Sequence, residues 1–281
     1  MIANGQILQD IHEPIGTTNN LIAGIDSIRF SAAGDEMQIV FTDGLTVNHG
    51  LASIDSVTFS ALAENPLAHS CGADSVHNAE LTYGSVVDEE GNFYKTIVIG
   101  TQEWMAENLK AGFYSNGDII ENVPDSAQWE GLTSGGWCHY LNDPQYECPY
   151  GKIYNWYAAV DPRNVCPLGW HVPSDGDWDV LVDYIGGYAF AGIKMRSEGS
   201  LYWVGYTGIV NTNETGFSGL PAGDRGMDGP FEDLTTHCAW WSTTANGSTN
   251  AWHRYTNWMF TELDRLNSRK WHALSIRCVR D

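Results

Sequence analysis

The chain has 281 residues, of which 43% are hydrophobic, and its 35 acidic and 14 basic side chains give a formal net charge of −21. A surface this acidic repels nucleic acid and anionic membranes, because phosphate binding needs a basic footprint. No stretch approaches the roughly 20 consecutive apolar residues of a membrane span, so we expect neither nucleic-acid binding nor membrane insertion from a chain of one or two domains.

The first 60 residues contain an internal repeat. GIDSIRFSA (residues 24–32) returns as SIDSVTFSA (residues 53–61), and each copy supplies β-branched and aromatic residues with partial alternation, as half-buried strands do. Asp43 and Gly44 between two apolar runs give a hairpin turn signal. We predict a small β segment over residues 1–60, with three or four strands between residues 20 and 60. Because so small a unit is marginal alone, we expect it to anchor the protein or to assemble with copies of itself or other subunits.

Residues 61–82 have little apolar pattern and contain Pro66, Cys71 and Gly72, which predicts a linker. From residue 83 to residue 281 the chain is rich in Gly, Trp and Tyr, with few long periodic runs. Two strands are predicted around a turn at residues 90–92, the second passing through residues 97–99. We expect an α+β domain with long loops and short antiparallel sheets.

One helix is well marked. Ser174, with Asp177 three residues later, approximates a capping box in which Asp replaces the usual Glu or Gln. Trp178, Leu181, Val182 and Ile185 form one apolar stripe, as the core-facing side of a helix does. Gly186 and Gly187 supply a stop signal.

Six cysteines are spread along the chain without a CxxC pair or a zinc-site spacing. This pattern favours disulfides and an oxidising compartment, with buried reduced thiols as the alternative. Residues 1–20 lack a secretory signal pattern, so either a signal has been removed or the chain leaves the cell by another route. Cys166 leads into the predicted helix and Cys278 lies in a predicted last strand, so a bond between them would close a long loop and stabilise the fold strongly in the chain-entropy model.

The region from about residue 83 to residue 281 resembles the Fibrobacter succinogenes major paralogous domain. Six blocks occur in order: DEEGNFYKTIVIGTQEWMAENLK, WCHYLNDPQYECPYGKIYNWYAAV, CPLGWHVPSDGDWDVL, ETGFSGLPAGDRG, WWSTT and SIRCVRD. The resemblance implies a secreted or cell-surface protein of the kind found in Fibrobacter and Bacteroidetes. It also implies a C-type lectin-like fold, related to the formylglycine-generating enzymes, with one or two helices. The repeat at residues 24–61 resembles N-terminal regions of exported Bacteroidetes proteins.

The same resemblance suggests how the cysteines pair. In C-type lectin-like folds a cysteine at the first helix pairs with one in the last strand, which implies a Cys166–Cys278 bond. The family often has two cysteines in the block that holds Cys138 and Cys148, which implies a local bridge. Cys71 and Cys238 remain, and their pairing would tie the linker to the lectin-like domain.

We expect no enzymatic activity and assign no catalytic residue. The formylglycine-generating relatives use a compact cysteine pair with copper, whereas Cys238 and Cys278 are well separated in this sequence. Cys166 has no sequence-adjacent base to lower its pKa, and His171 at a strand-to-helix turn is interpreted as a packed residue. The chain contains no HExxH motif, GxSxG motif or Gly-rich phosphate loop, the signatures of common hydrolases and nucleotide-binding enzymes.

Two stretches carry oxygen ligands near glycines, as calcium loops do: residues 88–92 and residues 223–233. Neither has EF-hand spacing, and the EPN and QPD tripeptides of calcium-dependent lectins are missing. We therefore assign no metal ligands and no cofactor, and leave room only for a structural calcium ion.

Residues 239–272 combine tryptophan, tyrosine, asparagine and arginine, a composition that recognition surfaces favour. We expect Trp240 and Trp241 to be at least half buried. The predicted ligand-binding residues are Trp252, Arg254, Tyr255, Asn257, Trp258, Asn267, Arg269 and Trp271. Of these, we expect the first five to be exposed.

Three functions are compatible with the sequence. The preferred one is a non-enzymatic extracellular or cell-surface recognition module that binds a glycan or a protein through this aromatic and polar face. The second is a structural subunit of an extracellular fibre, a phage tail or a contractile injection assembly. The third is an oxidase related to the formylglycine-generating enzymes, which the cysteine placement disfavours.

Overall fold

The computed structural model describes six strands within residues 6–61 and then residues 76–226 and 229–281. The chain divides into two compact units, residues 1–65 and residues 66–281. Among the described residues, none of the helices has the length and apolar composition to cross a membrane.

The first unit consists of two three-stranded antiparallel sheets, ordered β2–β1–β6 and β3–β4–β5. The strands are β1 Gln6–Glu13, β2 Gly16–Leu21, β3 Ile25–Phe30, β4 Glu36–Phe41, β5 Thr46–Gly50 and β6 Val57–Ala61. The strands β3 to β6 fall where three or four were predicted, and the two copies of the repeat enter different sheets. The strands β4 and β5 pair antiparallel as the hairpin signal predicted, while its turn at Asp43 and Gly44 lies outside the described residues.

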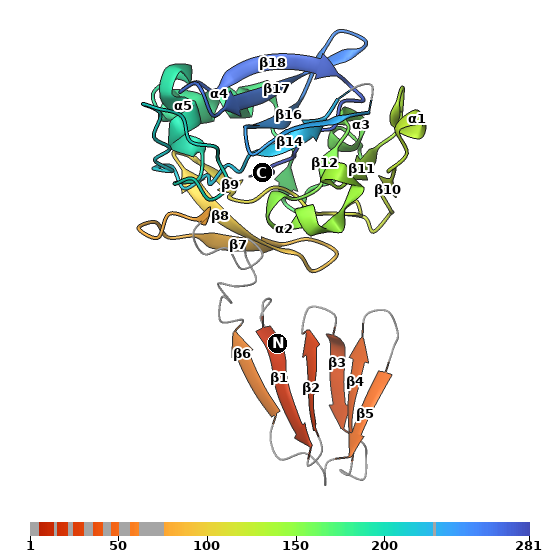
Figure 1. Cartoon of the computed structure of the whole chain (residues 1–281). Helices are drawn as coiled ribbons and strands as arrows, with labels where there is room; N and C mark the ends of the chain where they lie inside the picture. Colours follow the sequence, from red (N-terminus) through yellow and green to blue (C-terminus); the bar gives the residue numbers. More distant parts are fainter. Residues whose placement is uncertain are drawn as a thin grey trace. The chain divides into compact units, whose positions relative to one another are not determined.

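The second unit is an α+β domain with four small sheets (Figure 1). A five-stranded sheet has the order β13–β19–β9–β8–β7, and a three-stranded sheet has the order β16–β17–β18. The two remaining sheets are β10–β11–β12 and β14–β15. The bounds are β7 Gly84–Val87, β8 Phe93–Ile99, β9 Gln102–Met105, β10 Glu121–Asn122, β11 Gly136–Cys138, β12 Ile153–Tyr154, β13 Trp170–His171, β14 Ala222–Arg225, β15 Phe231–Leu234, β16 His237–Asn246, β17 Asn250–Asn257, β18 Asp264–Arg269 and β19 Val279–Arg280.

The helices of this domain are short, and they lie beside different sheets. Figure 1 shows α4 and α5 on one side of the domain and α1 and α3 on the other, next to β10, β11 and β12. The bounds are α1 Ser126–Trp129, α2 Glu147–Tyr150, α3 Trp156–Ala159, α4 Asp175–Tyr184 and α5 Tyr188–Met195, with 3-10 turns at Tyr140–Asn142 and Pro144–Tyr146.

The predicted helix is α4. The side chain of Ser174 accepts a hydrogen bond from the Asp177 amide, and the Asp177 carboxylate accepts one from the Ser174 amide, which completes the capping box. The predicted stripe Trp178, Leu181, Val182 and Ile185 is buried. After the helix, Gly186 and Gly187 have φ angles of 98° and 92°, a left-handed conformation that glycine adopts without strain. The sequence therefore predicted both ends of this helix.

The strand pair β7–β8 confirms the hairpin predicted around residues 90–92. Asp88 organises its turn by accepting hydrogen bonds from the amides of Glu90 and Asn92, and Gly91 has a φ of 82°. The pairing Val87 with Phe93 closes the hairpin.

The last strand of the chain, β19, lies beside the segment that leads into α4. The strand β19 pairs antiparallel with β13 and with β9. Beside it, Cys166 and Cys278, which are 112 positions apart in sequence, form a disulfide with Cα atoms 5.9 Å apart. Cys278 precedes β19 rather than lying within it, but the predicted covalent connection is confirmed.

Trp240 and Trp241 are both fully buried, as predicted. Because neighbouring residues of a strand point to opposite faces, the two indoles enter different parts of the core. Trp240 packs with Trp178 and Phe217, whereas Trp241 joins the cluster that contains Cys166 and Cys278.

The stretch assigned to a linker includes residues that pack on the second unit. Val76 is buried, and its carbonyl accepts a hydrogen bond from the Asn213 side chain. Asn78 in turn donates to the Asn213 carbonyl. These contacts join the domain core across more than 130 positions of sequence.

Candidate functional site

The predicted ligand-binding residues are distributed over three places in the structure. Trp252, Asn267 and Arg269 lie on one face of β17 and β18, where Trp252 pairs with Asn267 and Asn250 pairs with Arg269. The Asn250 amide donates to Asn267 Oδ1 at 2.8 Å, and Arg269 donates to Thr249 Oγ1 at 2.9 Å. Asn267 and Arg269 are exposed, and Trp252 is partly exposed.

Trp252 is covered on one side by a neighbour from β18. The guanidinium of Arg265 lies 3.5 Å from the centroid of the Trp252 ring, and it also donates twice to the carboxylate of Asp175. Trp271 lies farther along, partly buried, with Arg269 5.7 Å from its ring. The aromatic faces on this surface are therefore partly occupied by arginines of the protein itself.

Arg254 was expected to be exposed, and this expectation is wrong. Its side chain is fully buried, with Nη1 2.7 Å from Asp175 Oδ1 and Nη2 2.9 Å from Asp179 Oδ1. Burial acts to raise the pKa of Asp175, but hydrogen bonds from Arg265 and Arg254 outweigh it and hold that pKa below its ordinary value. Arg254 joins α4 to the sheet and offers no surface to a ligand.

Tyr255 and Asn257 lie on the other face of β17, with Trp252 and Arg254 facing away from them. Tyr255 is partly exposed, and its ring lies 5.0 Å from that of His237. Asn257 is buried, contrary to expectation, because its carbonyl accepts a hydrogen bond from Arg196 and its side chain accepts one from the Met259 amide. Strand alternation separates residues that the sequence pattern grouped together.

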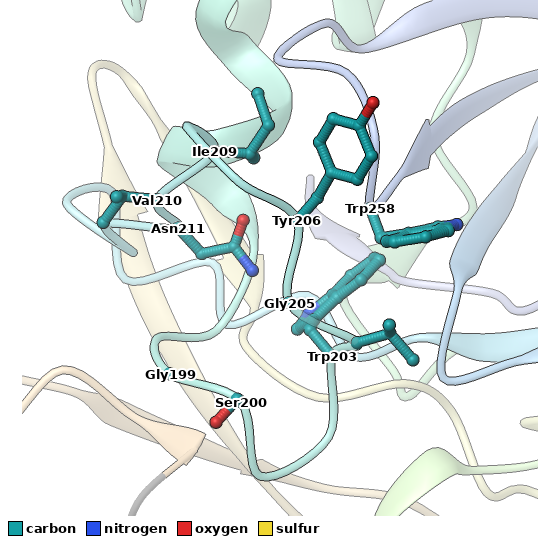
Figure 2. Close-up of a pocket in the computed structure, with 10 residues that line it drawn as sticks. Gly199, Ser200, Trp203, Gly205, Tyr206, Ile209, Val210, Asn211 and Trp258 are labelled. Atoms are coloured by element: carbon teal, nitrogen blue, oxygen red, sulfur yellow. The ribbon is translucent and has the colours of Figure 1, made fainter.

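Trp258, the third location, follows β17 and lines a cavity of about 240 Å³. Its walls are aromatic: Figure 2 shows Trp203, Tyr206 and Trp258 gathered on one side of the cavity. The Tyr206 and Trp258 rings meet at an interplanar angle of 87° with centroids 5.2 Å apart. Trp203 is buried and donates from Nε1 to the Gly219 carbonyl, so it forms a fixed floor.

The other side of this cavity, hereafter the Trp258 pocket, has no charge and combines the apolar side chains of Ile209 and Val210 with polar ones. Asn211 and Ser200 are the polar side chains there, and Asn211 extends toward the aromatic rings (Figure 2). Asn211 Oδ1 is buried without a hydrogen-bond partner in the described part of the chain. Gly199 and Gly205 line the cavity without side chains, which leaves the space open.

Trp203, Tyr206 and Asn211 were not predicted as site residues. The segment YWVGYTG over residues 202–208 carries three aromatic side chains next to glycines, a local signal for an exposed aromatic loop. That signal does not say that the loop meets Trp258, which lies more than 50 residues later. Tertiary packing brings them together.

The remaining cysteines depart from the predicted pairings. Cys138 and Cys238 are buried free thiols, whereas Cys148 is disulfide-bonded. Bridges between Cys138 and Cys148 and between Cys71 and Cys238 are therefore wrong. Cys138 instead packs in a core cluster with Trp129 and other apolar side chains, and burial raises the pKa of its thiol to about 11.

In the two stretches considered for calcium, Asp88, Glu90 and Asp224 bind other groups of the protein itself. Asp88 accepts four hydrogen bonds from the hairpin and from Tyr94, and Glu90 accepts from the Gly112 amide. In the second stretch, Asp224 lies 2.9 Å from His237 Nε2 and 3.3 Å from His272 Nε2. Within residues 76–226 and 229–281, no group of three or more His, Cys, Asp or Glu side chains is arranged to hold a metal ion.

One pair, the buried His253 and the partly exposed Ser268, has the composition of a nucleophile and its base. His253 Nε2 lies 3.1 Å from Ser268 Oγ. Burial, together with the neighbouring His272, lowers the pKa of His253 to about 3. A base with so low a pKa does not hold the proton that it would have to accept at neutral pH. This pair therefore serves packing and hydrogen bonding.

Comparison with known proteins identifies the chain through its family alone. No curated protein and no solved structure matches it. The model of the Fibrobacter succinogenes major domain matches residues 97–280, which include α4, both cysteines of the Cys166–Cys278 bridge and the whole Trp258 pocket. The chain belongs to the Fibrobacter succinogenes major domain family.

Proposed function

We propose that this chain is a non-enzymatic recognition module that binds a neutral glycan through the Trp258 pocket. The observation that carries the proposal is the absence of charge among the residues lining this pocket, in a protein with a net charge of −21. Binding sites for small ligands combine aromatic walls with a few well-placed polar groups. The Trp258 pocket has both.

The geometry suits a sugar ring. Tyr206 and Trp258 stand nearly perpendicular to one another, so a ligand ring that stacks on one aromatic face presents its own edge to the other aromatic ring. The CH groups of a pyranose can contact these faces, while Asn211 and Ser200 offer hydrogen bonds to its hydroxyl groups. Tyr206 is 47% exposed, which leaves it available to a ligand in solution.

The lining of the pocket also favours binding over catalysis. Its ten residues include no carboxylate, histidine, cysteine or lysine, the side chains that usually transfer protons or attack a substrate. Tyr206 is the one titratable side chain in that set. A glycan held there would lack a general acid and base.

We infer that the second unit has a C-type lectin-like fold and that the protein works outside the cell or at its surface. Strands near both ends of the unit, β7 and β19, share one sheet, and the Cys166–Cys278 bond ties the region before α4 to the last strand. Cys148 is also disulfide-bonded. Structural disulfides persist in oxidising compartments.

Glycan binding by the purified chain, followed on an array and then by calorimetry, tests the function. Trp258→Ala and Tyr206→Ala should each weaken binding at least tenfold, because an aromatic anchor in a binding pocket contributes about 2 kcal/mol. Trp252→Ala is the matched control, since Trp252 is a partly exposed tryptophan of β17 outside the pocket. The proposal fails if no neutral glycan binds, or if Trp252→Ala abolishes binding while Trp258→Ala does not.

A further inference from the structure

A second cavity, of about 510 Å³, lies on another side of the same domain. It is lined by Tyr114, Ile119, Glu121, residues 133–135, Tyr157 and residues 160–163. None of these residues lines the Trp258 pocket. In Figure 1 the elements around it, β10, β11 and α3, lie across the domain from α5. We call it the Tyr114 pocket.

The Tyr114 pocket combines apolar and hydroxyl-bearing walls. Ile119 is 71% exposed, and the half-buried ring of Tyr157 stands in the same lining. Thr133 and Ser134 are exposed and contribute hydroxyl groups. A ligand here can bury apolar surface and form hydrogen bonds at the same time.

The charges around the Tyr114 pocket are mainly negative. Glu121 is exposed in its lining. The one basic residue of the lining, Arg163, pairs with two carboxylates, at 2.8 Å from Asp161 and 3.1 Å from Asp118. Anionic ligands are therefore disfavoured, whereas a ligand with several hydroxyl groups finds carboxylate acceptors.

Tyr114 gives an independent indication of a ligand. Its side chain is only 1% exposed, and its hydroxyl faces Asp161 and Arg163, which are already paired with each other, without making a close hydrogen bond to either. The hydroxyl lies against Gly135 in the lining, where a Cβ would overlap it. Burial, reinforced by the nearby Asp161 carboxylate, raises the pKa of Tyr114 to about 12, so the group remains a hydrogen-bond donor at neutral pH. A buried donor without a close acceptor is costly, and a ligand hydroxyl at this wall would supply one.

We propose that the Tyr114 pocket is a second, independent saccharide site, selective for neutral sugars over anionic ones. It does not depend on the Trp258 pocket, and a chain with both sites would bind glycan surfaces bivalently. Linking two weak sites in one molecule increases overall avidity without any new contact.

The test is an NMR titration of the ¹⁵N-labelled full chain with D-glucose, D-galactose, D-mannose and N-acetyl-D-glucosamine, with D-glucuronic acid as the anionic comparison. Sugar concentrations up to about 10 mM cover dissociation constants near 1 mM. At least one neutral sugar should shift the amides of residues 133–135 and 157–163 and saturate, and D-glucuronic acid should bind more weakly.

Two variants separate recognition from structure. Tyr114→Phe should weaken binding about tenfold, as loss of one hydrogen bond does, while the melting temperature changes little, because this hydroxyl makes no close hydrogen bond in the free protein. Glu121→Gln, at an exposed position, should weaken neutral-sugar binding and improve binding of D-glucuronic acid. Trp258→Ala should leave these amide shifts unchanged.

Three results would overturn the second site. One is the lack of any shift in these amides with all four neutral sugars. Another is unchanged affinity in both Tyr114→Phe and Glu121→Gln. The third is stronger binding of D-glucuronic acid than of every neutral sugar. If Trp258→Ala loses glycan binding while the amide shifts at residues 157–163 persist, the loss is assigned to the Trp258 pocket, and the Tyr114 pocket is supported as an independent site.

Discussion

Arg254 and Asp175 form an ion pair that fixes the first turn of α4 to the middle of β17, with 2.7 Å between Nη1 and Oδ1. Asp175 is also held by Arg265, 2.6 Å from its other oxygen. The pair connects residues 79 positions apart in sequence. It explains why an arginine in an aromatic and polar stretch is fully buried instead of facing solvent.

Removing Arg254 should therefore destabilise the fold. Arg254→Met should lower the free energy of unfolding by about 2 kcal/mol, because it removes charged hydrogen bonds to Asp175 and Asp179, although Arg265 still pairs with Asp175. Urea unfolding followed by tryptophan fluorescence measures the change. Arg269→Met is the control, since the Arg269 side chain is exposed and donates to the exposed side chain of Thr249 and to Asn250, and it should change stability by less than about 0.5 kcal/mol. Equal effects of the two variants would contradict the assigned role.

The Cys166–Cys278 disulfide should be the main covalent support of the domain. The double variant Cys166→Ala/Cys278→Ala should lose about 2–5 kcal/mol of unfolding free energy, because the bond restricts a long loop in the unfolded chain. Cys238→Ala, which removes a buried thiol without breaking a bond, should cost about 1 kcal/mol. A smaller loss in the double variant than in Cys238→Ala would argue against this role.

The state of each cysteine can be read by alkylation and peptide mapping without reduction. In denaturant, Cys138 and Cys238 should react with iodoacetamide, whereas Cys148, Cys166 and Cys278 should not. In the native protein neither free thiol should react, because burial raises both pKa values and the thiolate is the reactive form. Recovery of a peptide joining Cys138 to Cys148 would refute this assignment.

His253 should make stability depend on pH. Its pKa is about 3 in the folded protein and 6.5 in the unfolded chain, so the unfolded state binds the extra proton first as the pH falls. The folded protein is therefore not penalised by this histidine above pH 6.5, and it loses stability as the pH falls from 6.5 toward 3. Over that range the unfolding equilibrium constant rises by at most about tenfold per pH unit. His253→Asn should reduce this slope between pH 6.5 and pH 4.5.

Urea titrations across that range measure the slope, which is the relevant quantity because the substitution also changes packing. Asp224 does not interfere, since hydrogen bonds from His237 and His272 outweigh burial and hold its pKa below 3.8. Its contribution is lost only at more acid pH. His171→Asn is the control, at a side chain that is 41% exposed. An identical slope for wild type and His253→Asn would exclude His253 as the source.

Local signals in the sequence were sufficient for several elements. The capping box at Ser174, the spacing of Trp178, Leu181 and Val182, and the turn residues between β7 and β8 each encode structure within about ten residues. Burial of Trp240 and Trp241 was also predicted. The Cys166–Cys278 bond came from a family resemblance, because the spacing of cysteines does not by itself select a pairing.

The ligand face could not be predicted in this way. Composition grouped Trp252, Arg254, Tyr255 and Asn257, but the period of two along β17 sends alternate side chains to opposite faces. Whether a face is exposed then depends on what packs against it. For Arg254 that is the acidic first turn of α4, and for Asn257 it is Arg196.

The sequence by itself determined the family, the acidic character of the chain and the α+β composition, because these reside in residue identities and short-range periodicity. The tertiary structure alone decided which aromatic side chains share a cavity: Trp258 meets Trp203 and Tyr206 only after β17 and the loop at residues 199–211 pack together. It also decided which charged residues are neutralised, since Arg254 and Asp175 find each other only when a helix and a strand distant in sequence come into contact.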